Sequence, residues 1–243
     1  MTILNLSFFF FPIAMLTSTI SGITGMGGGI LLLSFMASAF PAQSIIPMHG
    51  IIQLISNSSR AFLIRDQIKK QVFYFFLAGL PFGAFLSFKL IKTMHKNDYF
   101  LYIILVLLLY TIFKPKKMPA LKIPAKGFFL LGSFCGFAAM FTGATGPFLA
   151  PFFLRDDWSK QEIVATKASF QTFVHLFKIP VFLSLGFNYQ GNALPLLILS
   201  IGSIIGTKVG LFLLQKLPDK NFRLIFKCFL IVAAVKIIYK LYF

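Results

Sequence analysis

The chain has 243 residues, of which 58% are hydrophobic and only 12% are charged, and its formal net charge is +17. Charged residues alone make up about 25% of a soluble domain, so the composition excludes one and indicates a membrane protein with several spans. Most Lys and Arg residues flank apolar runs, which fits the positive-inside rule better than a nucleic-acid-binding surface.

The first apolar run, residues 5–39, contains the stretch GITGMGGGI, in which five of nine residues are glycine. The sequence predicts two half-helices, over 5–21 and 29–39, joined by an unwound glycine turn inside the membrane. Because irregular backbone at this depth needs polar partners from protein or water, the turn should line a cavity. A dinucleotide-binding fingerprint is excluded, because that site needs an acidic residue about 20 positions on and the next one is Asp66.

The remaining apolar runs approach the roughly 20 residues that a helix needs to cross a membrane. The connector KPKKMPALKIPAK, residues 114–126, has five lysines and three prolines, so it is predicted to be a basic cytoplasmic loop. The apolar runs on either side of it cover residues 44–64, 72–91, 99–113, 127–154, 163–185, 193–214 and 222–239.

The chain contains an internal repeat. TGMGGGILLLSFM, which starts at Thr24, aligns with TGATGPFLAPFFL, which starts at Thr142, at an offset of 118 residues. After five extra residues in the second copy, Gly83 aligns with Gly206. Such repeats are typical of transporters, and this one predicts two homologous transmembrane halves, 1–113 and 127–243. Each half would have one glycine-broken helix, re-entrant or discontinuous, followed by about three spans.

Polar residues in the span after each glycine turn fall on one helical face. The first face carries His49, Gln53 and Asn57, and the second carries Lys167, Gln171 and His175 at the same spacing. Ionisable residues inside a membrane are costly and usually mark a site or a pathway. No carboxylate lies deep in any span, so the predicted ligand is an anion. Arg60 and Lys178 extend these faces, but their side chains could equally reach the membrane surface.

The glycine turns are predicted to bind this anion through exposed backbone N–H groups, with tight helix packing as the alternative role for the glycines. No catalytic residue, metal ligand or cofactor is predicted. The predicted binding residues are Thr24, Gly25, Gly27, Gly28, Gly29, His49, Gln53, Asn57, Thr142, Gly143, Thr145, Gly146, Lys167, Gln171 and His175.

The distribution of basic loop residues favours inverted halves. If each glycine-broken segment is re-entrant, the halves are inverted and 14 basic loop residues lie inside against 5 outside. If each segment crosses once, the halves run parallel and the counts are 11 and 8. The first arrangement follows the positive-inside rule better and brings both turns towards the midplane, where inverted-repeat transporters bind substrate.

The chain resembles the sulfite exporter TauE/SafE family over nearly its whole length. The resemblance rests on GITGMGGG and GFAAMFTGATGP, which stand at equivalent places in the two halves. The resemblance implies a multi-pass transporter of the bacterial inner membrane that exports or takes up sulfite, sulfonates, sulfoacetate or thiosulfate. It also implies that the site region lies at residues 24–29 and 142–146. The second turn departs from the first, with Ala144, Thr145 and Pro147 in place of Met26, Gly27 and Gly29.

Two other functions are alternatives to a transporter. A passive anion channel fits the same residues and stays open. A membrane-embedded enzyme with His49 or His175 as general base is disfavoured, because no nucleophile–base–acid set or metal-ligand cluster accompanies them. The expected partners are the small anionic substrate and membrane lipid, without nucleic acid, and the oligomeric state, a homodimer or otherwise, is left open.

Overall fold

The structure, a computed structural model, describes residues 3–25, 27–93, 99–113, 121–153, 157–214, 235, 238 and 239. The all-helical prediction is confirmed, since these residues form helices and no strand. The run 222–239 and residues 114–120 of the connector lie outside the described residues, apart from the three isolated positions. The helices are α1 (Ile3–Thr24), α2 (Gly28–Ala39), α3 (Ala42–Leu63), α4 (Lys70–Thr93), α5 (Tyr99–Phe113), α6 (Gly127–Thr142), α7 (Gly146–Phe153), α8 (Lys160–Ser184) and α9 (Ala193–Leu213), with short 3-10 helices η1 (Arg65–Gln67) and η2 (Gln190–Asn192).

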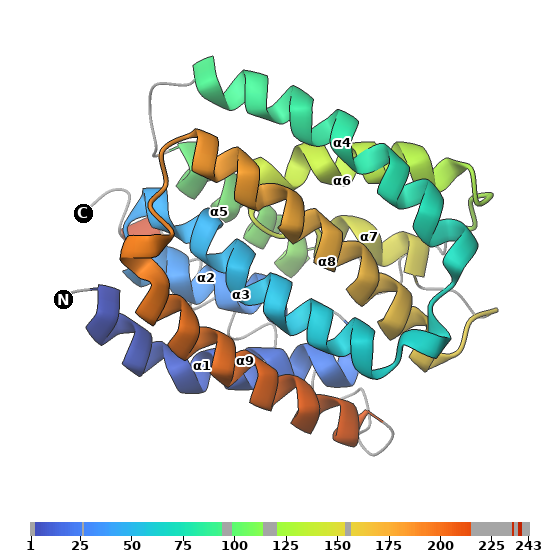
Figure 1. Ribbon diagram of the computed structural model, residues 1–243, viewed down its shortest axis with the longest axis horizontal. Coiled ribbons are helices and arrows are strands. Elements are labelled where there is room, and N and C mark those ends of the chain that lie inside the picture. The colour runs from blue at the N-terminus through green and yellow to red at the C-terminus, as the bar shows by residue number, and fades with distance from the viewer. Residues whose placement is uncertain are drawn as a thin grey trace.

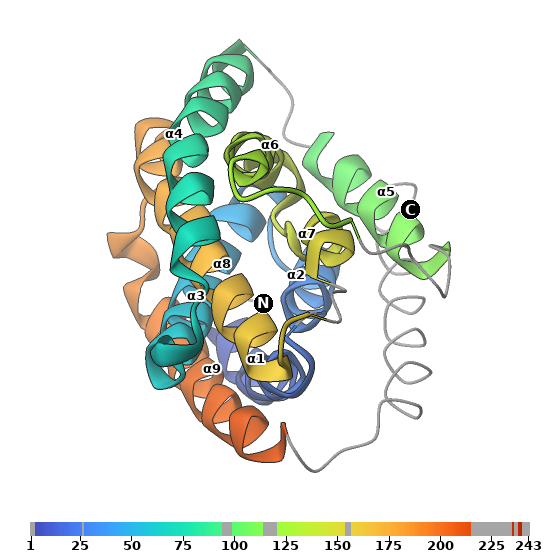
Figure 2. The same cartoon turned by 90° about the vertical axis from the view of Figure 1, so that its right-hand side faces the viewer.

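The helices form two layers (Figure 2). One layer has the order α4, α8, α3 and α9, and the other contains α6, α7, α2 and α1, with α5 outside it. The main packed pairs are α1 with α9, α4 with α6, and α3 with α8. The central pair α3 and α8 therefore lies opposite the two short helices α2 and α7, so the polar faces and the glycine turns meet in the middle of the protein.

Equivalent helices run in opposite directions along the molecule. In Figure 1, α1, α3 and α9 run from left to right, whereas α6, α8 and α4 run from right to left. The loop that follows α3 and the start of α8 lie at the right-hand end, and the loop between α8 and α9 lies at the left-hand end with the N-terminus. These two ends are called the 64–69 end and the 185–192 end below.

Two helix pairs pack with the same glycine contacts. In the α4–α6 pair, a Cβ added to Gly83 would collide with the carbonyl oxygen of Ser133. In the α1–α9 pair, a Cβ added to Gly206 would collide with the carbonyl oxygen of Met15. Glycine permits this close approach of two helix backbones. One turn earlier, Gly79 and Gly202 lie against the carbonyls of Phe129 and Phe11 in the same way.

The predicted half-helix over residues 5–21 is wrong. Helix α1 has 22 residues and is one of three segments among the described residues that are long and apolar enough to cross a membrane, with Lys70–Thr93 and Gln190–Leu213. The helix continues through Gly22, where it packs directly against Gly210 of α9. Helix α2, with 12 residues, is too short to cross.

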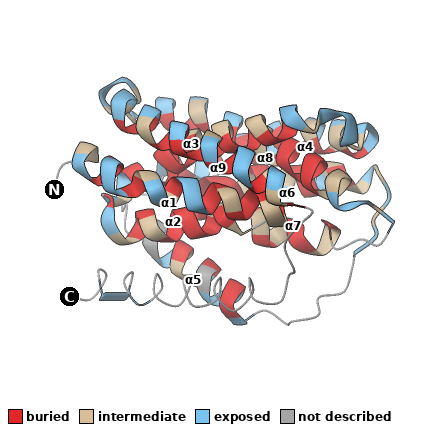
Figure 3. Cartoon of the chain, turned by 90° about the horizontal axis from the view of Figure 1, so that it is seen from below, coloured by how far each residue is buried: buried red, intermediate tan, exposed pale blue. Residues whose placement is uncertain are grey.

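The polar faces of α3 and α8 point into the protein. Both helices are of spanning length, with 22 and 25 residues, and Figure 3 shows their buried residues gathered towards the interior. Helix α2 is also enclosed, since Leu31, Leu32 and Leu33 are all buried. Protein therefore encloses the interrupted backbone and keeps it away from lipid.

A capping box starts α8 at the 64–69 end. The Ser159 hydroxyl accepts a hydrogen bond from the N–H of Glu162 at 3.2 Å, and the Glu162 carboxylate accepts from the N–H of Ser159 at 2.9 Å. Glu162 also forms an ion pair with Lys69. The hydrogen bond from Lys69, with help from the Ser159 N–H, holds the pKa of the Glu162 carboxyl below its usual range.

We expect Ser159→Ala to lower the free energy of unfolding by about 0.5–2 kcal/mol, because the first turn of α8 loses its side-chain acceptor. Thermal unfolding of the purified protein in detergent measures the change. Ser184→Ala at the other end of α8 is the control, because the Ser184 hydroxyl donates only to the Pro180 carbonyl of its own helix. Equal melting temperatures for the Ser159 variant and the unmodified protein would contradict a stabilising cap.

Candidate functional site

Glycines with positive φ form the breaks between the paired helices. Gly25 and Gly27, between α1 and α2, have φ of 68° and 95°, and Gly143, after α6, has φ of 72°. Side chains disfavour this backbone region. Each turn rests on a helix from the other part of the chain, because an added Cβ would meet Val164 of α8 at Gly25 and Ile46 of α3 at Gly143.

The first turns of α2 and α7 begin with backbone N–H groups that no described backbone carbonyl accepts. The N–H groups of Gly28, Gly29 and Gly146 have no backbone acceptor among the described residues, as expected at helix N-termini. A side-chain amide lies beside each start. A Cβ on Gly29 would be 3.1 Å from Gln53 Oε1, and one on Gly146 would be 3.6 Å from Gln171 Nε2. Both starts are therefore suited to an anion.

Two histidines meet beside these helix starts. His49 Nε2 donates to the carbonyl oxygen of Gly29 at 2.8 Å. The rings of His49 and His175 are edge to face, with centroids 5.7 Å apart and planes at 73°. Both Nδ1 atoms are buried without a hydrogen-bond partner among the described residues. Because the neutral His49 ring carries its proton on Nε2, its Nδ1 is an acceptor, and His175 Nδ1 is the ring nitrogen that can donate to an anion.

The ammonium group of Lys178 lies at the second turn. Its Nζ donates to the Gly143 carbonyl oxygen at 2.5 Å, and the side chain is fully buried. It also passes close to Gly50 of α3, where an added Cβ would be 3.3 Å from Lys178 Cδ. Because an ammonium has three N–H donors, this contact leaves donors for a ligand.

The interior holds positive charge without a buried carboxylate. Arg60 and Lys178 are at most 1% exposed. None of the described acidic residues is buried, since Asp66 and Asp157 are exposed and Glu162 is half-buried at the start of α8. Enclosing an uncompensated charge costs several kcal/mol. A bound anion would lower this cost.

The structure brings part of the predicted set together. Gly29, His49 and Gln53 lie at the start of α2, and His175 lies beside His49. Around the second turn, Gly143 accepts from Lys178, and Gly146 lies beside Gln171. Thr145 is buried there, and its hydroxyl has no partner among the described residues.

Other predicted residues have contacts within their own helices. The hydroxyls of Thr24 and Thr142 donate to the carbonyls of Ile20 and Ala138, one turn earlier. Gly28 packs against α1, since a Cβ there would collide with the Thr17 carbonyl oxygen. Gly27 is the residue before α2.

Two further predicted residues, Asn57 and Lys167, lie on the polar faces towards the 64–69 end. The Asn57 amide donates to the Gln53 carbonyl at 2.7 Å and to Gln53 Oε1 at 3.3 Å. Its own Oδ1 accepts from Arg60. Lys167 is fully buried on α8.

The sequence analysis left Arg60 and Lys178 without a role, because both lie near helix ends. Their burial shows that neither side chain reaches the membrane surface. One signal was present in the sequence: Arg60 and Lys178 occupy aligned positions of the repeat and continue the polar faces by one turn. A basic residue on the same face in both halves favours a shared role inside the protein.

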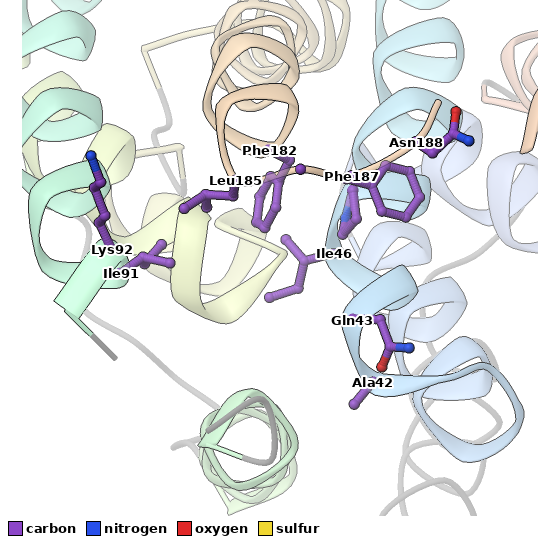
Figure 4. A pocket seen from close by; sticks show the side chains of 11 residues that line it. Ala42, Gln43, Ile46, Ile91, Lys92, Phe182, Leu185, Phe187 and Asn188 are labelled. Atoms are coloured by element: carbon purple, nitrogen blue, oxygen red, sulfur yellow. The ribbon is translucent and has the colours of Figure 1, made fainter. Parts of the chain in front are cut away.

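A cavity of about 440 Å³ opens at the 185–192 end above the second turn. In Figure 4, Ile46 and Phe182 face each other in its middle, whereas Gln43, Lys92 and Asn188 lie around its edge. Ile46 also lies against Gly143. The cavity therefore lies between the 185–192 end and the glycine turn at Gly143. Apolar side chains, Ile46 among them, separate the cavity from that turn. Its lining residues are Ala42, Gln43, Ile46, Pro47, Ile91, Lys92, Phe182, Leu185, Gly186, Phe187 and Asn188.

Comparison with protein families gives one match. The model described as Sulfite exporter TauE/SafE matches residues 10–237, which is nearly the whole chain. No curated protein and no solved structure is significantly similar to the chain.

Proposed function

The chain belongs to the sulfite exporter TauE/SafE family of membrane transporters, and from this premise we propose which anion it carries and where. The substrate is a small sulfur-containing anion, such as sulfite, a sulfonate or thiosulfate, moved across the bacterial inner membrane. It binds between the N-terminal N–H groups of α2 and α7 and the polar faces of α3 and α8, near Lys178 and the two histidines. The backbone N–H groups, the Lys178 ammonium and His175 offer donors from several directions, which suits an anion with several acceptor oxygens.

The observation that carries this proposal is buried positive charge without buried carboxylates among the described residues. A cation substrate would add to the cost of enclosing Lys178 at the second turn, whereas an anion would offset it. The helix N-termini at the glycine turns add partial positive charge to that of the buried side chains. Charge and backbone geometry therefore favour the same class of ligand.

We further propose that the two halves are inverted repeats around this site. The matched glycine contacts of the α1–α9 and α4–α6 pairs support it, since Gly83 and Gly206 are aligned residues and so are Ser133 and Met15. The opposite directions of α3 and α8 support it as well (Figure 1). In this arrangement α1 crosses the membrane, α2 returns part of the way, and α6 and α7 repeat the pattern from the other face.

The 64–69 end is then cytoplasmic, because the loops rich in basic residues gather there. We expect Gln43→Cys and Gln161→Cys, each in a background without Cys135 and Cys228, to react with an impermeant thiol reagent from opposite sides of the membrane. Labelling of oriented vesicles with and without permeabilisation measures this. Reaction of both cysteines from one side would contradict inverted halves and favour parallel ones.

Uptake of radiolabelled thiosulfate into proteoliposomes tests the function. We expect saturable uptake that excess unlabelled sulfite or a sulfonate inhibits, and that chloride inhibits far less at equal concentration. Vesicles without protein are the control. Uptake that rises linearly with thiosulfate concentration and shows no competition would indicate a passive anion channel, and no uptake above the control would contradict the proposed substrate class.

A further inference from the structure

A cluster of hydroxyl groups lies between α1, α3 and α9, away from the histidine pair. The Ser56 hydroxyl donates to Ser18 Oγ at 3.2 Å and lies 3.1 Å from Thr207 Oγ1. Ser203 lies one turn before Thr207 on α9, and its buried hydroxyl has no partner among the described residues. These side chains are at most 1% exposed. Three helices therefore direct hydroxyls to one enclosed place.

Arg60 lies in this cluster. Its guanidinium is 1% exposed and donates to Asn57 Oδ1 at 3.2 Å and to Ser56 Oγ at 3.3 Å, both neutral acceptors. Its Nε is buried without a partner among the described residues. A guanidinium carries five N–H donors and no acceptor. These two contacts therefore leave donors unused, and because both acceptors are neutral they do not balance the positive charge.

The aligned region of the other half shows that the helix packing does not require these hydroxyls. At the repeat offsets, Ser18 and Ser56 align with Gly136 and Val174. Gly136 packs against the backbone of Leu80 and Ala84, which align with Ser203 and Thr207. All four positions of the second set are buried and carry no side-chain polar atom. The two halves therefore share the same helix packing, and only the first of the two packed groups carries hydroxyls at these positions.

The Arg60 cluster is separate from the histidine pair. Arg60 follows His49 by 11 residues on α3, which at about 1.5 Å per residue places it about 16 Å further along the helix axis. It lies three residues before the end of α3, near the 64–69 end, whereas Lys178 lies towards the 185–192 end. Gln53 and Asn57 connect the two places through hydrogen bonds.

We propose that Arg60 and the hydroxyls of Ser18, Ser56, Ser203 and Thr207 form a second binding position for a small oxyanion, on the 64–69 side of the first. The guanidinium supplies charge-assisted hydrogen bonds, and the rotatable hydroxyls donate to the remaining oxygens. The proposal rests on the proposed function, since the second position lies on the same route through the protein. A transported sulfur oxyanion and cytoplasmic sulfate or phosphate share the required chemistry.

Equilibrium binding of radiolabelled thiosulfate to the purified full-length protein tests this position. We expect about two equivalents per chain in the unmodified protein and one in Arg60→Gln. The paired change Ser203→Ala and Thr207→Ala should weaken binding of the second equivalent by about a hundredfold or more, because it removes two hydrogen bonds to the anion and each is worth roughly 1.5 kcal/mol or more. Its melting temperature should change little, because Leu80 and Ala84 occupy the aligned positions. Competition by sulfite, sulfate and phosphate distinguishes the sources of the ligand.

Thr111→Ala is the matched control, since Thr111 is a buried threonine whose hydroxyl donates to its own helix on α5. If Arg60→Gln fails to fold, the paired serine–threonine variant still decides the outcome. One equivalent in the unmodified protein, or two equivalents of unchanged affinity in the paired variant, would overturn the second position and leave the first intact. No saturable binding in any of these proteins would contradict the proposed function itself.

Discussion

Lys178→Met should weaken the binding of sulfite or thiosulfate at the first position by about thirtyfold or more. The ammonium lies buried at the second glycine turn, with the Gly143 carbonyl as its recorded acceptor. Removing one partner of a buried hydrogen-bonded charge pair typically costs about 2–5 kcal/mol, which corresponds to roughly one and a half to three and a half orders of magnitude in affinity. Isothermal titration of the purified protein measures the change.

The same variant should keep or gain stability when no anion is present. Methionine carries no charge to enclose, and replacing a buried charge by an apolar side chain of similar length is often neutral or stabilising. In contrast, the rise of melting temperature that the anion gives to the unmodified protein, through preferential binding to the folded state, should disappear. Lys126→Met, at a surface position before α6, is the control. A destabilised variant with unchanged affinity would make Lys178 a structural residue.

Gly28→Ala should abolish transport and destabilise the protein, whereas Gly146→Ala at the aligned position should be mild. A Cβ at Gly28 would collide with the Thr17 carbonyl oxygen and with Ser21, so α2 could not keep its place beside α1. Overpacking typically costs about 1–3 kcal/mol, and collision with rigid backbone places Gly28→Ala at the upper end. At Gly146 the added carbon would meet only Gln171 Nε2, at 3.6 Å, an ordinary contact.

Thermal unfolding and thiosulfate uptake of the two variants, measured in parallel, decide this comparison. The pair also separates two roles of the glycines, since loss of affinity in folded Gly146→Ala would indicate close approach of the anion to the backbone. Equal stability of both variants would contradict the packing of α2 against α1.

Much of the fold follows from patterns within single segments. Apolar runs predict the positions of α3, α4, α8 and α9 to within a few residues. Each of these helices must bury its apolar surface or span the membrane over its whole length, so its limits are visible in its own sequence. The extension of α1 past residue 21 was missed, because it depends on contact between Gly22 and Gly210, which are far apart in the sequence. No local pattern records such a contact.

The candidate site was predictable in part for the same reason. Helical spacing groups His49 with Gln53 and His175 with Lys167, since these residues share a helix face. The position of Lys178 was not predictable, because a lysine six residues before the end of α8 reaches either the surface or the interior. The Gly143 carbonyl, supplied by another segment, stabilises the interior position. The Arg60 cluster likewise needs hydroxyls from α1 and α9.

A crystal structure with selenite, a heavier analogue of sulfite, tests the binding of the anion between the glycine turns most directly. Anomalous scattering locates the selenium atom without interpretation of weak density. We expect a peak within hydrogen-bonding reach of Lys178 Nζ, between the N-termini of α2 and α7, that excess sulfite removes. Selenium peaks confined to the protein surface, or peaks at this place that sulfite leaves unchanged, would contradict an anion site formed by the glycine turns and the buried cations.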